Sequence, residues 1–398
     1  MVVILLVIAL VAFATVSAVY GLYVLLILSS GKKKEYVRLI DQALIKPLAH
    51  QDLPSVSILV PTYNEEVVIS RKLQNLADLN YPLEKLEVLL LDDCSSDRTC
   101  EIAQNMFTKL GLSGKIIRSP DRSGANASYN RGVRNASNGL IMRTDADVTI
   151  EADALEKAVK IISKNEDVGG ITARMAPIID QTTAAVKVEG SYVTFFGGML
   201  TAESAIHSTF PGYGGFCLLR KSCFSPISVH RGSTDGNISL AVIKKGLRYI
   251  YVPQIVFHES ISHKLGEQRR QKVRRATRMI QSALIHRDII FREKFREFGR
   301  KIFPLRLAML TLCPVLMLAG LVSLFLAILS YSAVLAVSLA FAACILLYLG
   351  TRIDIPPLNS VTSLLIHQFY LLLGLLFVGK RTGTWKKTER SQPNKDEP

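Results

Sequence analysis

The sequence lacks the cysteine spacing of a disulfide-rich or zinc-binding module. Its 398 residues include six cysteines, and no two of them form a C-x-x-C pair. Such pairs mark structural zinc sites, and dense cysteine frameworks mark small secreted domains. Their absence excludes both classes of protein and favours a reducing compartment.

Acidic residues are also in short supply. Charged residues make up 20% of the chain, and 48 Lys and Arg face 33 Asp and Glu, so the formal net charge is +15. This balance excludes an acidic disordered protein and indicates an anionic partner. Residues 264–306 hold fourteen of the basic residues and only four acids. No groove-reading or aromatic-interleaved motif accompanies them, so we expect a membrane surface and no nucleic acid.

Two long stretches contain no charge at all. Residues 1–31 are uncharged and are followed directly by Lys32, Lys33 and Lys34, and residues 307–351 are uncharged as well. Mean hydropathy is +0.27, which is high for a soluble protein of this length. At about 20 residues per crossing, the sequence predicts one transmembrane helix in 1–31 and about three in 307–379, with a turn near Tyr331.

The basic residues predict the orientation of these spans. Lysines that directly follow the first span place the central block in the cytoplasm under the positive-inside rule. The predicted location is therefore the cell membrane, as a multi-pass protein with its central block inside the cell. The basic tail, residues 380–398, also has a cytoplasmic composition. Four spans would put that tail outside, so the number of C-terminal spans and the side of the C-terminus stay open.

The central block, residues 53–263, alternates strand-like and helical segments. Apolar runs at 56–61, 86–91, 115–117 and 140–142 predict strands, and helical spacing at 65–79, 97–110 and 127–135 predicts the helices between them. This order is typical of an α/β domain with a doubly wound, mostly parallel sheet. Ligands of such sheets bind beyond the carboxyl ends of the strands.

Polar side chains follow three of these strands. The first strand ends in Pro-Thr-Tyr-Asn-Glu, the second in Asp-Asp-Cys-Ser-Ser-Asp, and the fourth in Thr-Asp-Ala-Asp. Carboxylates gathered at one edge repel one another unless a cation, hydroxyls or a base receives them. We therefore expect a binding site here, with Asp97 serving mainly as a helix cap. The residues concerned are Pro61, Thr62, Tyr63, Asn64, Glu65, Asp92, Asp93, Asp145 and Asp147.

These motifs, in this order and spacing, resemble the family 2 inverting glycosyltransferases, which have a GT-A fold. The likeness covers about residues 55–278. It implies a nucleotide-sugar donor along the strand ends, with a UDP-sugar favoured over a GDP-sugar. Thr62, Asn64 and Glu65 would line the nucleotide pocket, and Asp93 would contact the base. Asp145 would face the ribose and sugar, while Asp147 would hold Mg²⁺ or Mn²⁺ against the diphosphate.

The same resemblance extends to the acceptor side. Gly214, Gly215 and Phe216 match the family's acceptor segment. Asp235 matches the general base, which takes the proton of the acceptor hydroxyl during inversion. A purely structural alternative is that Asp235 caps the helix that follows it. His258 is either a packing residue or a third metal ligand.

In residues 264–306 apolar side chains recur between the basic ones, which predicts basic amphipathic helices at the membrane interface. The membrane-embedded members of the resembling family carry Gln-x-x-Arg-Trp at the start of this segment. Gln271 and Arg274 fit this motif and would contribute to the donor site, but Arg275 stands where the acceptor-side tryptophan is expected. Two further departures are Ala125 in place of a phosphate-side lysine and Thr234 in place of a glutamate. Arg122 and Arg143 are candidate substitutes for the lysine. Three Asn-x-Ser sequons, at Asn126, Asn135 and Asn237, have no use in a cytoplasmic domain.

The function that these observations favour is a membrane-bound inverting glycosyltransferase with a lipid-linked or glycan acceptor. A processive polysaccharide synthase is the alternative within enzymes, although few spans and a missing tryptophan weigh against it. A membrane scaffold that has lost activity is the non-enzyme alternative. A transporter is disfavoured because the predicted spans hold no charge.

Overall fold

The computed structural model describes residues 1–29, 31–45, 50–178, 196–260, 265–352 and 356–383. Most of the predicted basic tail lies outside these residues. The chain divides into two compact units, which are described separately. An α/β unit contains residues 31–178, 200–270 and 380–398, and a helical unit contains residues 1–30, 179–199 and 271–379.

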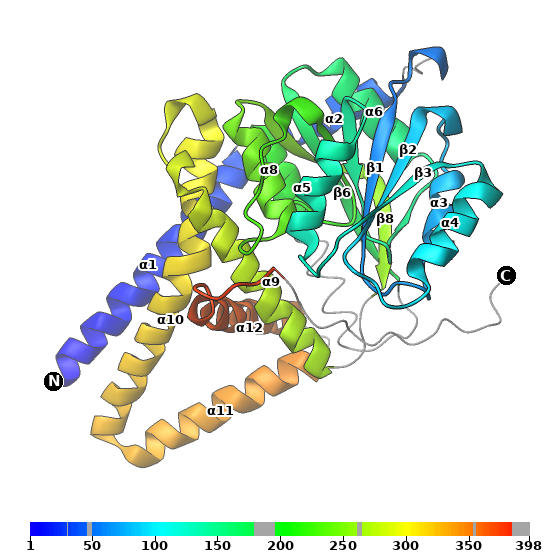
Figure 1. Cartoon of the computed structure of the whole chain (residues 1–398). Helices are drawn as coiled ribbons and strands as arrows, with labels where there is room; N and C mark the ends of the chain where they lie inside the picture. The colour runs from blue at the N-terminus through cyan, green and yellow to red at the C-terminus, as the bar shows by residue number, and fades with distance from the viewer. Residues whose placement is uncertain (30, 46–49, 179–195, 261–264, 353–355, 384–398) are drawn as a thin grey trace. The chain divides into compact units, whose positions relative to one another are not determined.

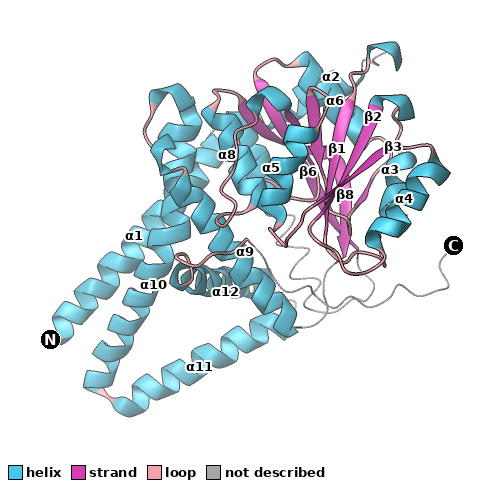
Figure 2. Ribbon diagram, in the orientation of Figure 1, coloured by secondary structure: helices cyan, strands magenta, loops and turns pink. Residues whose placement is uncertain are grey.

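The α/β unit is built on one eight-stranded sheet, whose strands are drawn in magenta in Figure 2. The strand order is β3-β2-β1-β4-β7-β6-β8-β5. Strands β3, β2, β1 and β4 are parallel, whereas β7 is antiparallel to both of its neighbours, β8 is parallel to β6, and β5 is antiparallel to β8. The bounds are β1 Val56–Thr62, β2 Leu86–Asp92, β3 Ser113–Arg118, β4 Leu140–Arg143, β5 Thr149–Ile150, β6 Val168–Ile178, β7 Cys217–Arg220 and β8 Arg248–Ser260.

The sequence explains why β1 and β2 lie inside the sheet. Val56, Ile58, Leu59 and Val60 have no exposed surface. A strand that is covered on both faces needs such a continuous apolar run, whereas a half-exposed strand would alternate. The predicted mostly parallel α/β sheet is confirmed, and the predicted strands and helices are found within a few residues of their expected limits.

The helices that connect the strands along the chain cover the sheet. In Figure 1, α3 and α4 lie side by side beyond β3, and α5 lies beside α8. The N-terminal helix of this unit, α2, packs on α6, and Tyr36 donates a hydrogen bond from its hydroxyl to the carbonyl of Tyr251 on β8 (2.8 Å). The bounds are α2 Lys32–Ile45, α3 Ile69–Ala77, α4 Thr99–Leu110, α5 Ala125–Asn135, α6 Ala154–Lys164 and α8 Thr234–Lys244.

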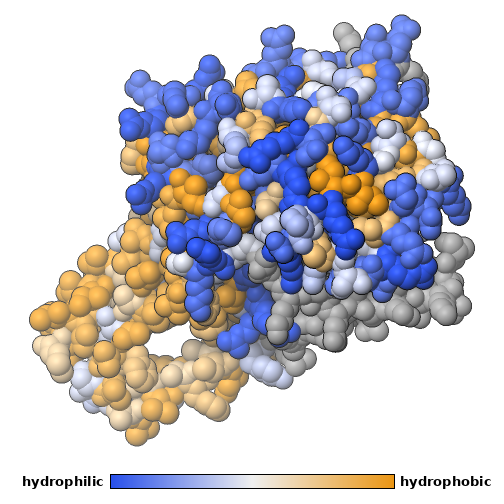
Figure 3. Space-filling model, viewed as in Figure 1, coloured by the Kyte–Doolittle hydropathy of each residue, from blue (hydrophilic) through white to orange (hydrophobic). Residues whose placement is uncertain are grey.

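The helical unit contains long apolar helices. These are α1 Val2–Ser29, α10 Phe303–Tyr331, α11 Ala333–Arg352 and α12 Pro356–Leu376, and α9 Leu265–Ile285 enters the unit at Gln271. Apolar side chains dominate the visible surface of α1, α10 and α11 (Figure 3). Among the described residues, three helical stretches are long and apolar enough to cross a membrane, namely Val2–Leu28, Phe298–Tyr331 and Ala333–Gly350, and Thr362–Leu376 is a shorter apolar helix.

The turn that was predicted near Tyr331 separates α10 from α11. Two of the long helices pack closely at a glycine. A Cβ atom placed on Gly320 of α10 would lie 3.0 Å from the ring of Phe13 on α1. Small residues at such contacts let helices approach each other in lipid, where the hydrophobic effect does not drive association. The predicted basic segment 264–306 consists of α9 followed by short helical turns.

Candidate active site

The loops that follow β1 and β2 are joined by hydrogen bonds. The backbone N–H of Asn64 donates to Ser95 Oγ (2.9 Å), and the N–H of Ser96 donates to Asn64 Oδ1 (2.8 Å). Asn64 has φ of 55°, a left-handed conformation that asparagine tolerates better than most residues. This conformation turns the chain sharply at the carboxyl end of the strand, and the two loops form one wall of the site.

A second set of bonds extends this wall. The N–H of Glu65 donates to Thr99 Oγ1 (2.7 Å), and the N–H of Glu66 donates to Asp97 Oδ2 (3.2 Å). Asp97 Oδ1 also accepts the N–H of Thr99 (3.0 Å), the first residue of α4. Arg98 occupies the N-cap position of α4, so Asp97 lies one residue before the cap, and its carboxylate ties the start of α4 to the loop after β1.

Asp92 and Asp93 have different surroundings. The carboxylate of Asp92 is fully buried, accepts the N–H of Ser95 (3.2 Å) and pairs with Arg118 (3.3 Å). Asp93 accepts the N–H of Ser123 (2.8 Å) and the N–H of Gly124 (2.8 Å). Asp92 thus closes the turn of its own loop, whereas Asp93 holds the 123–124 segment beside it. Recognition of a base by Asp93 remains a prediction.

The segment that Asp93 holds brings two further features to the wall. The guanidinium carbon of Arg122 lies 3.8 Å from the centre of the Tyr63 ring, a cation–π contact. Gly124 has φ of 85°, and a Cβ atom there would overlap the carbonyl of Gly383. The N–H of Thr382 donates to the carbonyl of His230 (2.8 Å). Residues 382–383 therefore pack directly on this glycine.

Arg143 organises the carboxyl end of β4. Its side chain is buried and donates to Asp145 Oδ1 (2.6 Å) and to the carbonyl of Gly214. Burial alone would lower the pKa of this guanidinium, but Asp145 and Asp235 raise it above its usual range. Arg143 is therefore a fixed positive charge between a predicted donor-site acid and the predicted acceptor segment. It does not replace the missing lysine as a free side chain, because it is committed to these bonds.

Asp145, Asp147 and Asp235 belong to one electrostatic neighbourhood. Burial raises the pKa of Asp145 above its usual range, Arg143 opposes that change, and both Asp147 and Asp235 add to it. Asp235 is the second residue of α8, whose N-cap Ser233 accepts the N–H of Gly236 (3.1 Å). Ser233, not Asp235, therefore provides the side-chain cap, which leaves the Asp235 carboxylate available for chemistry.

Lys72 lies beneath this acidic group, and the sequence analysis missed it. Its ammonium donates to Thr144 Oγ1 (2.8 Å) and to the carbonyl of Val148 (2.9 Å), on either side of the two aspartates. Burial lowers its pKa to about 7, while Asp145 and Asp147 act in the opposite direction. A buried lysine is costly unless acids lie nearby. Lys72 therefore braces the turn that presents Asp145 and Asp147.

The chemistry of Asp145 and Asp147 fits a hard divalent cation. Mg²⁺ is often held by one or two carboxylates, with substrate phosphates and water completing its shell. No group of three or more His, Cys, Asp or Glu side chains is placed for a metal within the described part of the chain. His258 Nε2 instead lies 3.3 Å from Oε1 of Glu151, the residue that follows β5.

The predicted acceptor segment is held by close packing. A Cβ atom on Gly215 would lie 2.3 Å from Phe257, so only glycine fits there. Phe216 is fully buried, and therefore supports the segment from below. Gln271, Arg274 and Arg275 lie on the part of α9 that belongs to the helical unit, where Arg275 is exposed and the other two are half-buried. Their roles remain predictions.

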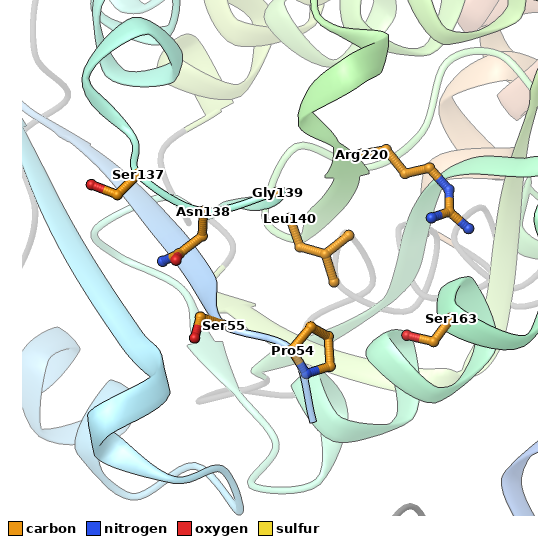
Figure 4. Close-up of a pocket in the computed structure, with 8 residues that line it drawn as sticks. All are labelled: Pro54, Ser55, Ser137, Asn138, Gly139, Leu140, Ser163 and Arg220. Atoms are coloured by element: carbon orange, nitrogen blue, oxygen red, sulfur yellow. The ribbon is translucent and has the colours of Figure 1, made fainter. Parts of the chain in front are cut away.

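A pocket of about 450 Å³ lies at the amino ends of the strands, opposite the carboxyl ends (Figure 4). It is located where β1 and β4 begin, so it is separate from the carboxyl ends that carry the predicted residues. The Arg220 guanidinium donates to the carbonyls of Ile162 (2.6 Å) and Val168 (3.0 Å), which stabilises the end of α6. No acid lines the pocket, and none of the predicted site residues does. Its lining is Pro54, Ser55, Ser137, Asn138, Gly139, Leu140, Ser163 and Arg220.

Comparison with known families identifies the part of the chain that carries this site. Residues 57–225 match the model of glycosyl transferase family 2. This segment is a family 2 glycosyltransferase domain. The family match includes the loops after β1, β2 and β4 as well as the segment of Gly214, and it confirms the resemblance seen in the sequence.

Curated relatives of this family 2 domain are glycosyltransferases. The chain is 33% identical over 130 residues to the probable glycosyltransferase YdaM of Bacillus subtilis, covering 32% of this chain and 31% of that protein. It is 24% identical over 276 residues to an N-acetylglucosaminyltransferase of Rhizobium meliloti, covering 65% and 64%. It is 28% identical over 188 residues to a poly-beta-1,6-N-acetyl-D-glucosamine synthase of Staphylococcus epidermidis, covering 47% and 44%. The chain thus spans between 31% and 64% of the length of these relatives.

A solved structure shares the fold more extensively. The mannosyltransferase PcManGT of Pyrobaculum calidifontis, in complex with GDP-Man and Mn²⁺, aligns with a TM-score of 0.70 at 22% identity. The alignment covers 93% of this chain and 98% of that protein. The GT-A fold of the family 2 domain is therefore confirmed. The alignment also extends beyond residues 57–225.

Proposed function

We propose that this chain is a membrane-bound inverting glycosyltransferase that moves a sugar from a nucleotide-sugar donor to a lipid-linked or glycan acceptor. One observation carries the proposal. Arg143 joins the donor-side acid Asp145 to the acceptor-side carbonyl of Gly214, and Asp235 lies close enough to act on the charge of both Arg143 and Asp145. The residues that we assign to the donor, the acceptor and the base are therefore neighbours, which supports the proposal.

The donor would lie along the ends of β1, β2 and β4. Tyr63, stacked on Arg122, offers an aromatic face, and the wall held by Asp93 flanks it. Asp147 would hold Mg²⁺ or Mn²⁺, which would stabilise negative charge on the leaving diphosphate. Asp145, which is paired with Arg143, would face the ribose and sugar. We favour UDP-sugars as donors. GDP-sugars are included in the assay because PcManGT, which shares the fold, was solved with GDP-Man.

Asp235 would act as the general base. As the acceptor oxygen attacks the anomeric carbon, a new carbon–oxygen bond forms and the bond to the nucleoside diphosphate breaks. The hydroxyl proton passes to the Asp235 carboxylate, and the electron pair of the broken bond leaves with the diphosphate. Attack from the face opposite the leaving group inverts the anomeric centre. Arg143 holds Asp145 and the Gly214 segment in fixed geometry during this step.

A second candidate is the extension of a polysaccharide. It is supported by the similarity to the poly-beta-1,6-N-acetyl-D-glucosamine synthase. Arg275 replaces the tryptophan of the resembling synthases, which favours a single transfer. The product length distinguishes the two functions, because a synthase yields a ladder of products and a single transferase yields one.

The function is tested with purified full-length protein in detergent and a panel of radiolabelled UDP- and GDP-sugars. Lipid extraction and gel filtration then separate lipid-linked from polymeric product. We expect one donor to give a lipid-soluble or short glycan product with inverted anomeric configuration. Failure to transfer from every donor to either class of acceptor, by protein that binds a nucleotide-sugar, would favour the scaffold alternative.

We also propose that the α/β unit faces the cytoplasm at the cell membrane. The three apolar helices and the lysines that begin α2 support this orientation. A cysteine introduced at Gln42, an exposed position on α2, is expected to escape impermeant maleimide in intact cells and to react after lysis. Labelling of that cysteine in intact cells would reverse the orientation.

A further inference from the structure

The loop that leads into α8 is held by three buried asparagines, Asn126, Asn130 and Asn237, which we call the asparagine clamp. Asn130 Nδ2 donates to the carbonyl of Ile227 (2.8 Å), and its Oδ1 accepts the N–H of Ile227 (3.0 Å). Asn237 Nδ2 donates to the carbonyl of Arg231 (3.2 Å). The clamp therefore grips the loop at its start and near its end.

Asn126 makes the contacts nearest to Asp235. Its Nδ2 donates to the carbonyls of Ser228 (2.7 Å) and Gly232 (3.2 Å), and its Oδ1 accepts the hydroxyl of Thr234 (2.6 Å). Asn126 has no exposed surface, and Thr234 is 4% exposed. Hydrogen bonds shielded from water in this way are costly to leave unmade, because the unsatisfied group keeps its desolvation penalty.

The bond to Thr234 fixes the start of α8. Thr234 is the first residue of this helix, and Asp235 is the second. Asn126 lies in the first turn of α5. A neutral hydrogen bond thus joins the first turns of two helices, and the backbone that carries Asp235 leaves directly from one end of that bond.

This contact also brings together the departures from the family pattern. Ala125 replaces the expected lysine and is the neighbour of Asn126, while Thr234 replaces the expected glutamate. Taken separately, these two changes support the scaffold alternative. In the structure Asn126, the neighbour of Ala125, contacts Thr234, so both departures lie beside one buried hydrogen bond.

We propose that Asn126 and Thr234 form a neutral positioning pair that sets the Asp235 carboxylate in place for proton transfer. The inference rests on the proposed function. Neither residue touches the reacting atoms, so both act through the backbone of α8. Misplacing a catalytic group by about 1 Å costs roughly 10²-fold in rate, and ground-state donor binding does not depend on that placement.

The test compares Thr234→Val with Thr234→Ser in full-length protein. Valine keeps the shape of threonine but cannot donate to Asn126, whereas serine keeps the hydroxyl. We expect Thr234→Val to lower kcat by about 10–10²-fold with unchanged Kd for the nucleotide-sugar, and Thr234→Ser to stay near the wild-type rate. A kcat for folded Thr234→Val equal to the wild-type value would overturn the proposal, as would equal losses in both variants.

A double-mutant cycle separates positioning from a general structural effect. In an Asp235→Asn background the base is already absent, so Thr234→Val should cause no further loss of kcat. A loss as large as in the wild-type background would contradict the proposal. The proposed role of Asp235 as the base is tested separately, by the transfer rate of the single variant. If Asp235→Asn alone transfers at the wild-type rate, the assignment of the base fails, whatever Thr234→Val does.

Discussion

Asp147→Ala is expected to abolish sugar transfer together with metal-dependent binding of the donor. Asp145 and Asp147 are the two acids at the end of β4 whose charges act on each other. Removing the Asp147 carboxylate takes away the protein ligand of a cation that must also bind the diphosphate. Isothermal titration of the nucleotide-sugar, with and without Mn²⁺, measures the binding, and a radiolabel assay measures the transfer.

Asp78→Ala is the matched control for this variant. Asp78 is an exposed aspartate at the end of α3, where it accepts a hydrogen bond from Gln74 (2.9 Å). Its loss should leave the affinity for the donor and the rate of transfer unchanged. Full activity of Asp147→Ala, or undiminished wild-type activity in EDTA, would show that this turn does not serve a metal.

Asp235→Asn is expected to separate binding from chemistry. The amide keeps the size of the carboxylate, and Ser233 still caps α8, so the fold and the affinity for the donor should be preserved. The amide cannot accept the hydroxyl proton in the transition state. Loss of a general base typically lowers the rate by about 10²–10⁴-fold. Single-turnover kinetics at saturating donor would show the loss in kcat alone.

A wild-type rate for Asp235→Asn would place the base elsewhere and exclude the proposed role. The structure ranks the alternatives that the sequence offers. Glu203 is fully buried and accepts the hydroxyl of Thr209 (2.6 Å), whereas Glu259 on β8 is half-buried. Glu259 would therefore be tested first.

Much of the sheet can be predicted from the sequence because each strand is marked by a short run of apolar residues. Mostly apolar runs such as 86–91 have the length of buried strands, and acids that follow neighbouring parallel strands gather at the same end of the sheet. From the sequence alone, Thr234 is visible only as a departure from the glutamate of the resembling family. Its partner Asn126 lies 108 residues away along the chain, and no local pattern indicates that pairing.

The sequence also contains patterns that indicate the buried Lys72 and the helix α2. Lys72 lies three residues after Ile69 and four before Leu76, so it shares the apolar face of α3, where a lysine needs a buried acceptor. The helix α2 was not predicted, although Tyr36 and Ile40 have the spacing of one helical face. The asparagines of two sequons, Asn126 and Asn237, are buried in the asparagine clamp, a role that the sequence analysis did not assign to them.

The interleaving of strands along the chain limits how the domain can be cut for expression. The family match stops at residue 225, yet β8 lies between β6 and β5 in the sheet and begins at Arg248. A fragment ending at 225 would leave the long edge of β6 open to association with other chains and would remove the pairing partner of β5. A soluble fragment would need to extend at least from α2, which Tyr36 ties to β8, through Ser260.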